Sequence, residues 1–410
     1  MDFKMKYQYT YFIYPYVIEE KKYRNYIYQL LKNSNCKLKL FDRKKDVGID
    51  TYFLPELKEK MFWSLEKKPS EIKELESMDK KMQATIISQQ PCNMFEYTLE
   101  GDVPGKIGEA GGIFFDITKV EIICFNTGVC FLMLKTALTE NQNFSDVLNF
   151  NYKFRDINSK AEHSKQYETI KIQTGKLNNM QAFADFVKKI AGHNLKAKQI
   201  NLDTDRLITY SYVCLNQASW NENTDINLLE KQFEKYRTVK PAREQTEDAL
   251  LKEAYTYREK YLYYGFSNNT TVLLTCDNNI KNYTTLPFQF ENEQLYHFIF
   301  NLYKKIYLKK LNYEFQKNEQ FELVKKEFLS FAKKEWIYEV TYDEIGKILE
   351  KYYAEEQILQ TTFHKLKQKY DLLYKDYEIG RNKESNKWII AIMIIMIIIN
   401  VASIIFVASR

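Results

Sequence analysis

The strongest constraint on this chain is an uncharged apolar run near its C-terminal end. Residues Trp388 to Ala408 read WIIAIMIIMIIINVASIIFVA. At about 1.5 Å per residue, such a helix is about 31 Å long, which matches the hydrocarbon core of a bilayer. A core helix rarely runs so far without a charge. We therefore predict one transmembrane helix over 388–408, with Trp388 at the membrane interface.

Charges beside the apolar run indicate its orientation. Arg381, Lys383 and Lys387 precede it, and only Arg410 follows. Cytoplasmic flanks of membrane helices carry the excess of Lys and Arg. We expect a single-pass membrane protein whose large N-terminal body is cytoplasmic.

The predicted span carries a polar stripe. Met393, Met396, Asn400, Ser403 and Val407 are spaced at three and four residues, so they share one side of a helix. A polar side chain inside a membrane usually faces a partner helix or water. The stripe then either makes an interhelical hydrogen bond in an oligomer or lines a pore through Met393, Met396, Asn400 and Ser403.

A second periodic pattern precedes the span. Its apolar positions alternate at four and three residues, as in the a/d seam of a coiled coil: Leu359, Phe363, Leu366, Tyr370, Leu373 and Tyr377. The seam predicts parallel self-association of a helical stalk, and its bulky rings favour more than two chains. The alternative is an amphipathic helix packed on its own domain. Gly380 is a candidate bend.

The remaining sequence alternates strand and helix patterns, which predicts an α+β fold. Two β-rich runs, 113–125 and 129–138, flank Asn126-Thr127-Gly128, a hairpin signal. We expect strands at 4–15, 37–41, 171–174, 207–214, 261–266 and 270–276, and helices at 20–33, from Pro55, 180–190, 226–238 and 243–260. The prediction is an α/β sandwich around a mixed sheet (1–215), a mixed helix/strand extension (216–290), a helical stalk (291–387) and the span (388–408).

Composition argues against several functions. The net charge is only +6, from 60 basic and 54 acidic residues, so no direct binding of nucleic acid is expected. The six cysteines form no C-x-x-C pair and the four histidines are scattered, which argues against a zinc site and favours buried thiols. No catalytic motif is present, and no enzyme activity is expected. A membrane-bound enzyme would need a polar pocket within 1–290.

One glycine-rich stretch is a candidate anion-binding loop. GDVPGKIGEAGG places Gly105, Lys106 and Gly108 together, and backbone N–H groups of such loops can bind phosphate. Ile107 follows Lys106 where a Walker A loop needs Ser or Thr. The alternative is an ordinary surface loop before a strand. The sequence identifies no cofactor.

Architecture and several short motifs resemble the CorA-type divalent-cation channel family, in particular its divergent CorA-like prokaryotic members. The matching stretches are YFIYPY (Tyr11–Tyr16), YFLPELKEKMF (Tyr52–Phe62), FNTGVCFLMLKTAL (Phe125–Leu138), YGFSNNTTVLLT (Tyr264–Thr275) and WIYEVTYDEIGKILEKYY (Trp336–Tyr353). The chain departs from the family in having one span instead of two and no Gly-Met-Asn motif, which argues against magnesium selectivity.

The resemblance implies a homo-oligomer in a prokaryotic cell membrane, with a pentamer as one candidate. It also implies an antiviral-defence role and a nucleotide second messenger as trigger. We therefore expect a homo-oligomeric membrane effector or ion-channel-like protein, gated by its cytosolic domain. The alternatives are a non-conducting tail-anchored scaffold and a divalent-cation transporter.

Overall fold

The structure is a computed structural model of the whole chain. It describes residues 2–99, 103–107, 112–139, 143–156, 170–173, 180–182, 187, 200, 202, 205–243, 256–317 and 321–408.

The described strands form one mixed sheet of twelve. Its spatial order is β10-β11-β12-β9-β1-β6-β5-β4-β7-β8, and β2 and β3 branch from β5. Only β12 and β9 pair in parallel; the other described neighbours are antiparallel. The strands are β1 (Met5–Val17), β2 (Cys36–Lys39), β3 (Cys92–Tyr97), β4 (Val103–Ile107), β5 (Ile113–Phe125), β6 (Val129–Leu138), β7 (Ile170–Gln173), β8 (Met180–Ala182), β9 (Ile208–Leu215), β10 (Thr256–Glu259), β11 (Leu262–Ser267) and β12 (Thr270–Cys276).

The predicted hairpin is confirmed as β5 and β6, with the three-residue turn between them. Gly128 has φ +87°, a conformation that side chains disfavour, and a Cβ there would lie 2.2 Å from the carbonyl oxygen of Ile18. Gly128 is thus required both by the turn and by the close approach of the chain after β1.

The first strand is longer than predicted. We expected it to end at Pro15, but β1 continues to Val17. Its pairing with β9 ends at Ile13, while its pairing with β6 continues through Pro15 to Val17. Beyond Ile13, β1 has one partner strand, so the missing N–H of Pro15 costs no hydrogen bond to β9.

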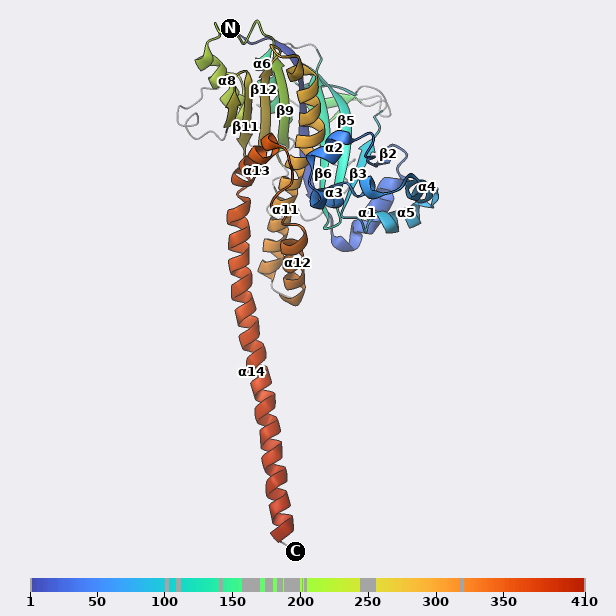
Figure 1. The fold of residues 1–410 in the computed structure, drawn as a ribbon, viewed down its shortest axis with the longest axis vertical. Coiled ribbons are helices and arrows are strands. Elements are labelled where there is room, and N and C mark those ends of the chain that lie inside the picture. The colour runs from blue at the N-terminus through green and yellow to red at the C-terminus, as the bar shows by residue number, and fades with distance from the viewer. Residues whose placement is uncertain are drawn as a thin grey trace.

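Helices cover both faces of the sheet (Figure 1). On one face lie α2 (Val47–Tyr52), α3 (Pro55–Met61), α10 (Thr285–Gln289), α11 (Leu295–Lys317) and α13 (Glu344–Glu356). The other face carries α1 (Glu20–Lys32), α4 (Pro69–Ser77), α5 (Lys80–Ile87), α6 (Phe144–Phe154) and α8 (Ile226–Thr238). Short turns of helix are η1 (Trp63–Glu66), η3 (Ile280–Tyr283) and η4 (Phe290–Gln294). The mixed α/β architecture is confirmed.

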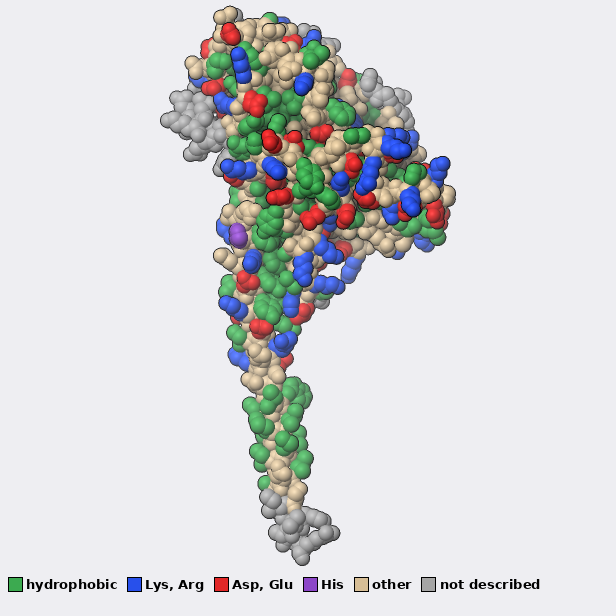
Figure 2. All heavy atoms as spheres, in the orientation of Figure 1, with side chains coloured by type: hydrophobic (Ala, Val, Ile, Leu, Met, Phe, Trp, Pro, Cys, Tyr) green, Lys and Arg blue, Asp and Glu red, His purple; other side chains and the backbone are tan. Residues whose placement is uncertain are grey.

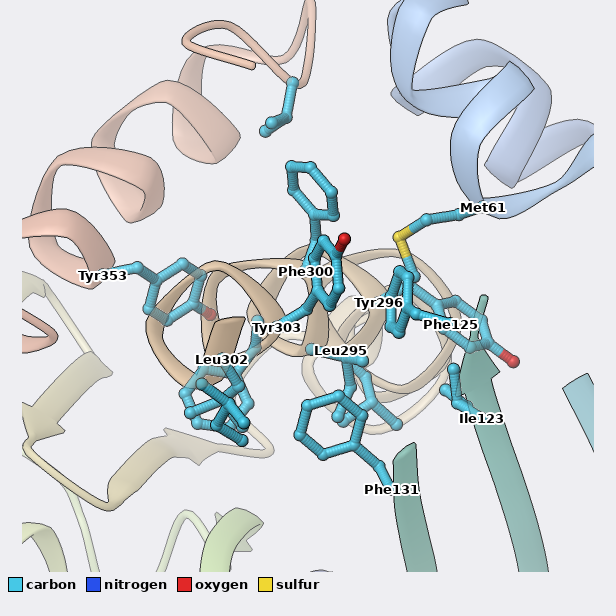
Figure 3. Close-up of a cluster of buried hydrophobic side chains, with 14 of the residues drawn as sticks. Met61, Ile123, Phe125, Phe131, Leu295, Tyr296, Phe300, Leu302, Tyr303 and Tyr353 are labelled. Carbon is cyan, nitrogen blue, oxygen red and sulfur yellow. The ribbon is translucent and has the colours of Figure 1, made fainter. Parts of the chain in front are cut away.

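Helix α11 forms the centre of one hydrophobic core. Leu295, Tyr296, Phe300 and Tyr303 lie between the strand residues Ile123 to Phe131 and the helices α3 and α13 (Figure 3). The first half of α11, which lies inside the predicted stalk (291–387), therefore packs in the body. Strands β10 to β12 join the same sheet as β1, so 216–290 extends the first region.

Two predicted helices are wrong over part of their length, although Val187 within 180–190 is helical as predicted. Residues 180–182 form β8 and residues 256–259 form β10. Periodicity over short stretches does not separate an amphipathic helix from a strand that adds to a sheet. Most of 183–190 and all of 244–255 lie outside the described residues.

The C-terminal part of the chain forms one helix, α14 (Leu359–Ala408), of 50 residues. It leaves the body beside α12 (Phe321–Lys334) and continues far beyond it (Figure 1). Gly380 lies inside this helix with nothing within 4 Å of its Cβ position, and the helix is unbroken there. Among the described residues, α14 is the one helix long and apolar enough to cross a membrane.

Candidate functional site at the junction of body and membrane helix

The aromatic side of α14 packs on helices of the same chain. Phe363 stacks on Trp336 with 4.3 Å between ring centroids, and Tyr370 stacks on Phe328 of α12 at 4.8 Å. Further along, Tyr377 packs against Phe321 at 5.4 Å. Leu359 and Leu366 are buried, at 1% and 3% exposure. The upper part of α14 is thus one member of a three-helix leg with α11 and α12.

These contacts match the alternative that the seam packs on its own domain. Phe363, Tyr370 and Leu373 join the core cluster that contains α11 and α12. A parallel zipper between copies would have to replace those contacts. Association through Leu359, Phe363, Leu366, Tyr370, Leu373 and Tyr377 therefore stays a prediction, and the residues' observed role is to fix α14 to the body.

A buried polar network joins α11 to α13, the helix just before α14. Glu350 of α13 lies between three groups of α11: His297 Nε2 at 2.5 Å, Asn301 Nδ2 at 2.7 Å and Lys304 Nζ at 3.0 Å. On the other side of the ring, Tyr52 OH lies 3.1 Å from His297 Nδ1. The spacing of 297, 301 and 304 places the three α11 groups on one helix face.

Glu350 is the anion of this network. Burial by itself would raise its pKa, but Lys304, His297 and Asn301 favour the carboxylate and lower the pKa to about 2. A carboxylate only accepts hydrogen bonds, so Nε2 of His297 carries the proton between them. Glu350 therefore stays ionised at neutral pH. It orients α13 on α11 and is unsuited to act as a general acid.

A second buried ion pair positions the partner of Phe363. Lys60 of α3 bonds to Glu335, which also accepts from Tyr303 OH at 2.9 Å. Glu335 directly precedes Trp336, whose ring lies on Phe363. The body thus holds the start of α14 from two directions: α13 on one side and the segment after α12 on the other.

The two residues between α13 and α14, Gln357 and Ile358, form the junction. Ile358 has φ +53°, which is the left-handed region. For a β-branched residue this conformation costs about 1–2 kcal/mol. The strain lets α13 end and α14 start at once in a new direction, so that Leu359 enters the core while Ile358 stays 55% exposed.

Beyond the leg, the surface of α14 changes abruptly. The last charge of the described helix is Lys387, and exposed apolar side chains dominate the segment that follows, from Trp388 on (Figure 2). Ile398 is 61% exposed and Trp388 is 72% exposed, although both are large and apolar. Apolar side chains on all sides of a helix need an apolar environment, which a bilayer provides.

The polar stripe lies on this apolar part of α14. Met393, Met396, Asn400 and Ser403 are all exposed. The Ser403 hydroxyl donates to the Ile399 carbonyl at 2.8 Å, so it is satisfied within its own helix. In the part of the chain that the structure describes, the Asn400 amide makes no side-chain hydrogen bond. Of the two polar groups, Asn400 is the one that needs an external partner.

The predicted anion-binding loop is a strand where it is described. Gly105 and Lys106 belong to β4, which pairs with β5 and β7. A Cβ at Gly105 would lie 2.1 Å from the ring of Phe115, so packing explains this glycine. Lys106 lies over the Phe114 ring at 5.5 Å. Gly108 lies outside the described residues, and phosphate binding there stays a prediction.

Sequence reasoning missed the polar network. It treated His297 as one of four scattered histidines. The available signal was His297, Asn301 and Lys304 at helical spacing on α11, a helix that is buried over most of its length, where polar groups need buried partners. Among the described residues there is no group of His, Cys, Asp or Glu that could hold a metal ion. All six cysteines are free and buried.

Comparison with known proteins gives no relative for this arrangement. No family model, no curated protein and no solved structure matches the chain.

Proposed function

We propose that this protein is a membrane effector in which the α/β body receives a signal and α14 carries it to a membrane span. One observation carries the proposal: the same unbroken helix is fixed to the body at Leu359 to Tyr377 and is uncharged and largely apolar from Trp388 to Ala408. A helix of this length reaches about 75 Å. A change in how α13 or α12 holds its upper end would tilt or rotate the whole rod.

The unpaired amide of Asn400 supports association of the spans. In hydrocarbon, an amide without a hydrogen-bond partner is costly, and a second copy of the same helix offers the same amide in return. We propose that spans of several copies meet along Met393, Met396 and Asn400. The flanking Arg381, Lys383 and Lys387 support a cytoplasmic body.

The assembly then acts as an ion-channel-like effector gated from the body. The resemblance to CorA-like proteins extends the proposal to prokaryotic antiviral defence and a nucleotide second messenger. A non-conducting, tail-anchored scaffold is the alternative, and the free amide of Asn400 would serve it equally well. Divalent-cation transport is a second alternative, with less support because the chain lacks Gly-Met-Asn.

Cysteine cross-linking of the full chain in membranes tests the association. Met393→Cys lies on the stripe, and the control Ile394→Cys lies about 100° away on the same turn. We expect the first to cross-link and the second to remain monomeric. If both cross-link equally, or neither does, the stripe is not the contact.

Asn400→Leu, with Ser403→Ala as its matched control, tests whether hydrogen bonding by the Asn400 amide holds the spans together. An intramembrane hydrogen bond is worth about 1 kcal/mol, so we expect Asn400→Leu to weaken association about fivefold and Ser403→Ala to leave it unchanged. Dye release from liposomes then separates the channel proposal from the scaffold alternative. Release that falls with Asn400→Leu supports a channel. Association of the wild-type chain without release from the liposomes supports the scaffold.

A further inference from the structure

A small cavity lies at one end of the sheet, between the strands and α11. The start of β9 and the turn between β11 and β12 form one side, through Ile208 and Asn269. The other side is α11, through Lys305, Ile306 and Lys309, and Arg206 lies at the rim. Three cationic residues thus line a space of about 40 Å³.

We infer that this cavity binds a phosphoryl group or a similar oxyanion of a soluble ligand. Charge-assisted hydrogen bonds from Lys and Arg are the usual means of holding such a group. The cavity offers these donors from two parts of the chain that are about 100 residues apart, which only the fold brings together.

Two of the cations, Lys305 and Arg206, are held in place by a neighbour and keep donors for a ligand. Lys305 Nζ donates to the side-chain oxygen of Asn268 at 2.6 Å and to its carbonyl at 3.3 Å. An ammonium has three N–H groups, so one is left. Arg206 Nε lies 3.2 Å from Asp156 Oδ1, which leaves the two terminal nitrogens of the guanidinium.

The positive charges repel one another in this position. Burial and then the nearby Lys309 lower the pKa of Lys305 to about 8, and Glu356 opposes them. Two ammonium groups on one helix turn are destabilising unless an anion lies between them. An oxyanion in the cavity would remove that repulsion and would also bond to Arg206.

Size and position limit the ligand. A bound water needs about 10–15 Å³ of such space, so 40 Å³ admits one phosphoryl group. The rest of the ligand would extend past Arg206, whose side chain is 56% exposed. Glu356, beside Lys305, precedes α14, whose stretch from Leu359 to Trp388 rises over 29 residues, or about 44 Å of helix. A lipid headgroup therefore does not reach the cavity when α14 stands upright.

Titration calorimetry of the full chain with inorganic phosphate tests the site. In neutral phosphatidylcholine nanodiscs we expect saturable binding of one phosphate per chain. A charged hydrogen bond is worth about 1.5–3 kcal/mol, so Lys305→Met and Lys309→Met should each weaken binding at least about tenfold. Lys310→Met is the matched control: it removes the same charge from the same helix, but Lys310 donates to the Thr127 carbonyl at 3.1 Å outside the cavity.

Three results would overturn the assignment: no saturable binding to the wild-type chain, equal loss in all three variants, or binding that Lys305→Met leaves unchanged. If Lys305→Met fails to fold, Arg206→Gln at the exposed rim provides the same comparison.

Nanodiscs that contain phosphatidylserine test whether the bound anion is a soluble ligand or a lipid headgroup. Phosphate affinity that is equal in both lipids supports a soluble ligand, and affinity reduced by phosphatidylserine would mean that lipid headgroups occupy the cavity. Phosphate binding measured in this way is independent of association or conduction through the span.

Discussion

Phe363 of α14 stacks on Trp336, with ring centroids 4.3 Å apart and ring planes within 13° of parallel. This contact joins the membrane helix to the segment that follows α12. Phe363 also lies 6.0 Å from Phe328 of α12, centroid to centroid. The first ring of the heptad seam, which is half-buried, is therefore covered by its own chain, and its removal should loosen α14 from the body.

Phe363→Ala should lower the free energy of unfolding of the leg by about 2–4 kcal/mol, since truncating a packed aromatic ring removes apolar contact and leaves a cavity. Leu372→Ala is the control on the same helix: Leu372 is 66% exposed, so its loss should change stability by less than about 0.5 kcal/mol. Thermal unfolding of the solubilised chain gives both values. Equal effects from the two variants would show that Phe363 does not pack inside the chain.

The mass of the solubilised Phe363→Ala variant tests the prediction that the seam joins copies of the chain. If the seam joins copies, the variant should dissociate; if it packs within each chain, the oligomeric state should be unchanged. We expect it to be unchanged, because association is proposed to lie in the span.

Glu350→Gln should destabilise the body by about 3–5 kcal/mol, because it leaves Lys304 buried without its anion. Glu355→Gln, on the exposed side of the same helix, should have little effect. Denaturant unfolding at pH 7 measures the difference. A Glu350→Gln variant as stable as the Glu355→Gln control would mean that α13 is held on α11 without the polar network.

The polar network around Glu350 also predicts that the protein loses stability in acid. The pKa of Glu350 falls from its ordinary 4.5 to about 2 on folding, so its stabilisation is complete above about pH 4.5 and is lost as the pH falls towards 2. The resulting loss in the free energy of unfolding is at most about 3 kcal/mol. Unfolding measured between pH 6 and pH 3 should show a steeper loss for the wild type than for Glu350→Gln.

Glu293 predicts the opposite dependence of stability on pH. Burial, and then the charge of Asp343, raise its pKa from 4.5 to about 7, so its ionised form opposes folding above pH 7 and this cost disappears as the pH falls. Glu293→Gln should therefore stabilise the chain at pH 8, by up to about 3 kcal/mol, and leave it nearly unchanged at pH 5. The exposed Glu339→Gln is the control. A stabilisation that is the same at both pH values would contradict the ionisation argument.

Two glycines predict opposite effects of one substitution. Gly105→Ala places a methyl group 2.1 Å from the Phe115 ring and should cost about 1–3 kcal/mol by overpacking. Gly380→Ala meets nothing within 4 Å on an exposed helix and should stabilise it by about 1 kcal/mol. Thermal unfolding and helix content by circular dichroism measure both. Destabilisation by Gly380→Ala would indicate that α14 bends there.

Local patterns predicted the elements that depend on local physics. The β5–β6 hairpin follows from Asn126-Thr127-Gly128 between two β-rich runs, and the buried side of α1 follows from the helical spacing of Tyr23, Ile27 and Leu30. Patterns failed where a strand is defined by its neighbours. Strand β4 exists because β5 and β7 pair with it, and its glycine fits the ring of Phe115.

The sequence by itself determined that this chain has an apolar helix able to span a membrane, because length and absence of charge are properties of one segment. It also determined that Leu359 to Tyr377 presents one apolar side. Tertiary structure alone decided that this side meets Trp336 and Phe328, that Glu350 meets His297, and that Arg206 and Lys305 line one cavity. Periodicity states which side of a helix must be covered, whereas the identity of the covering group depends on contacts between residues far apart in the chain.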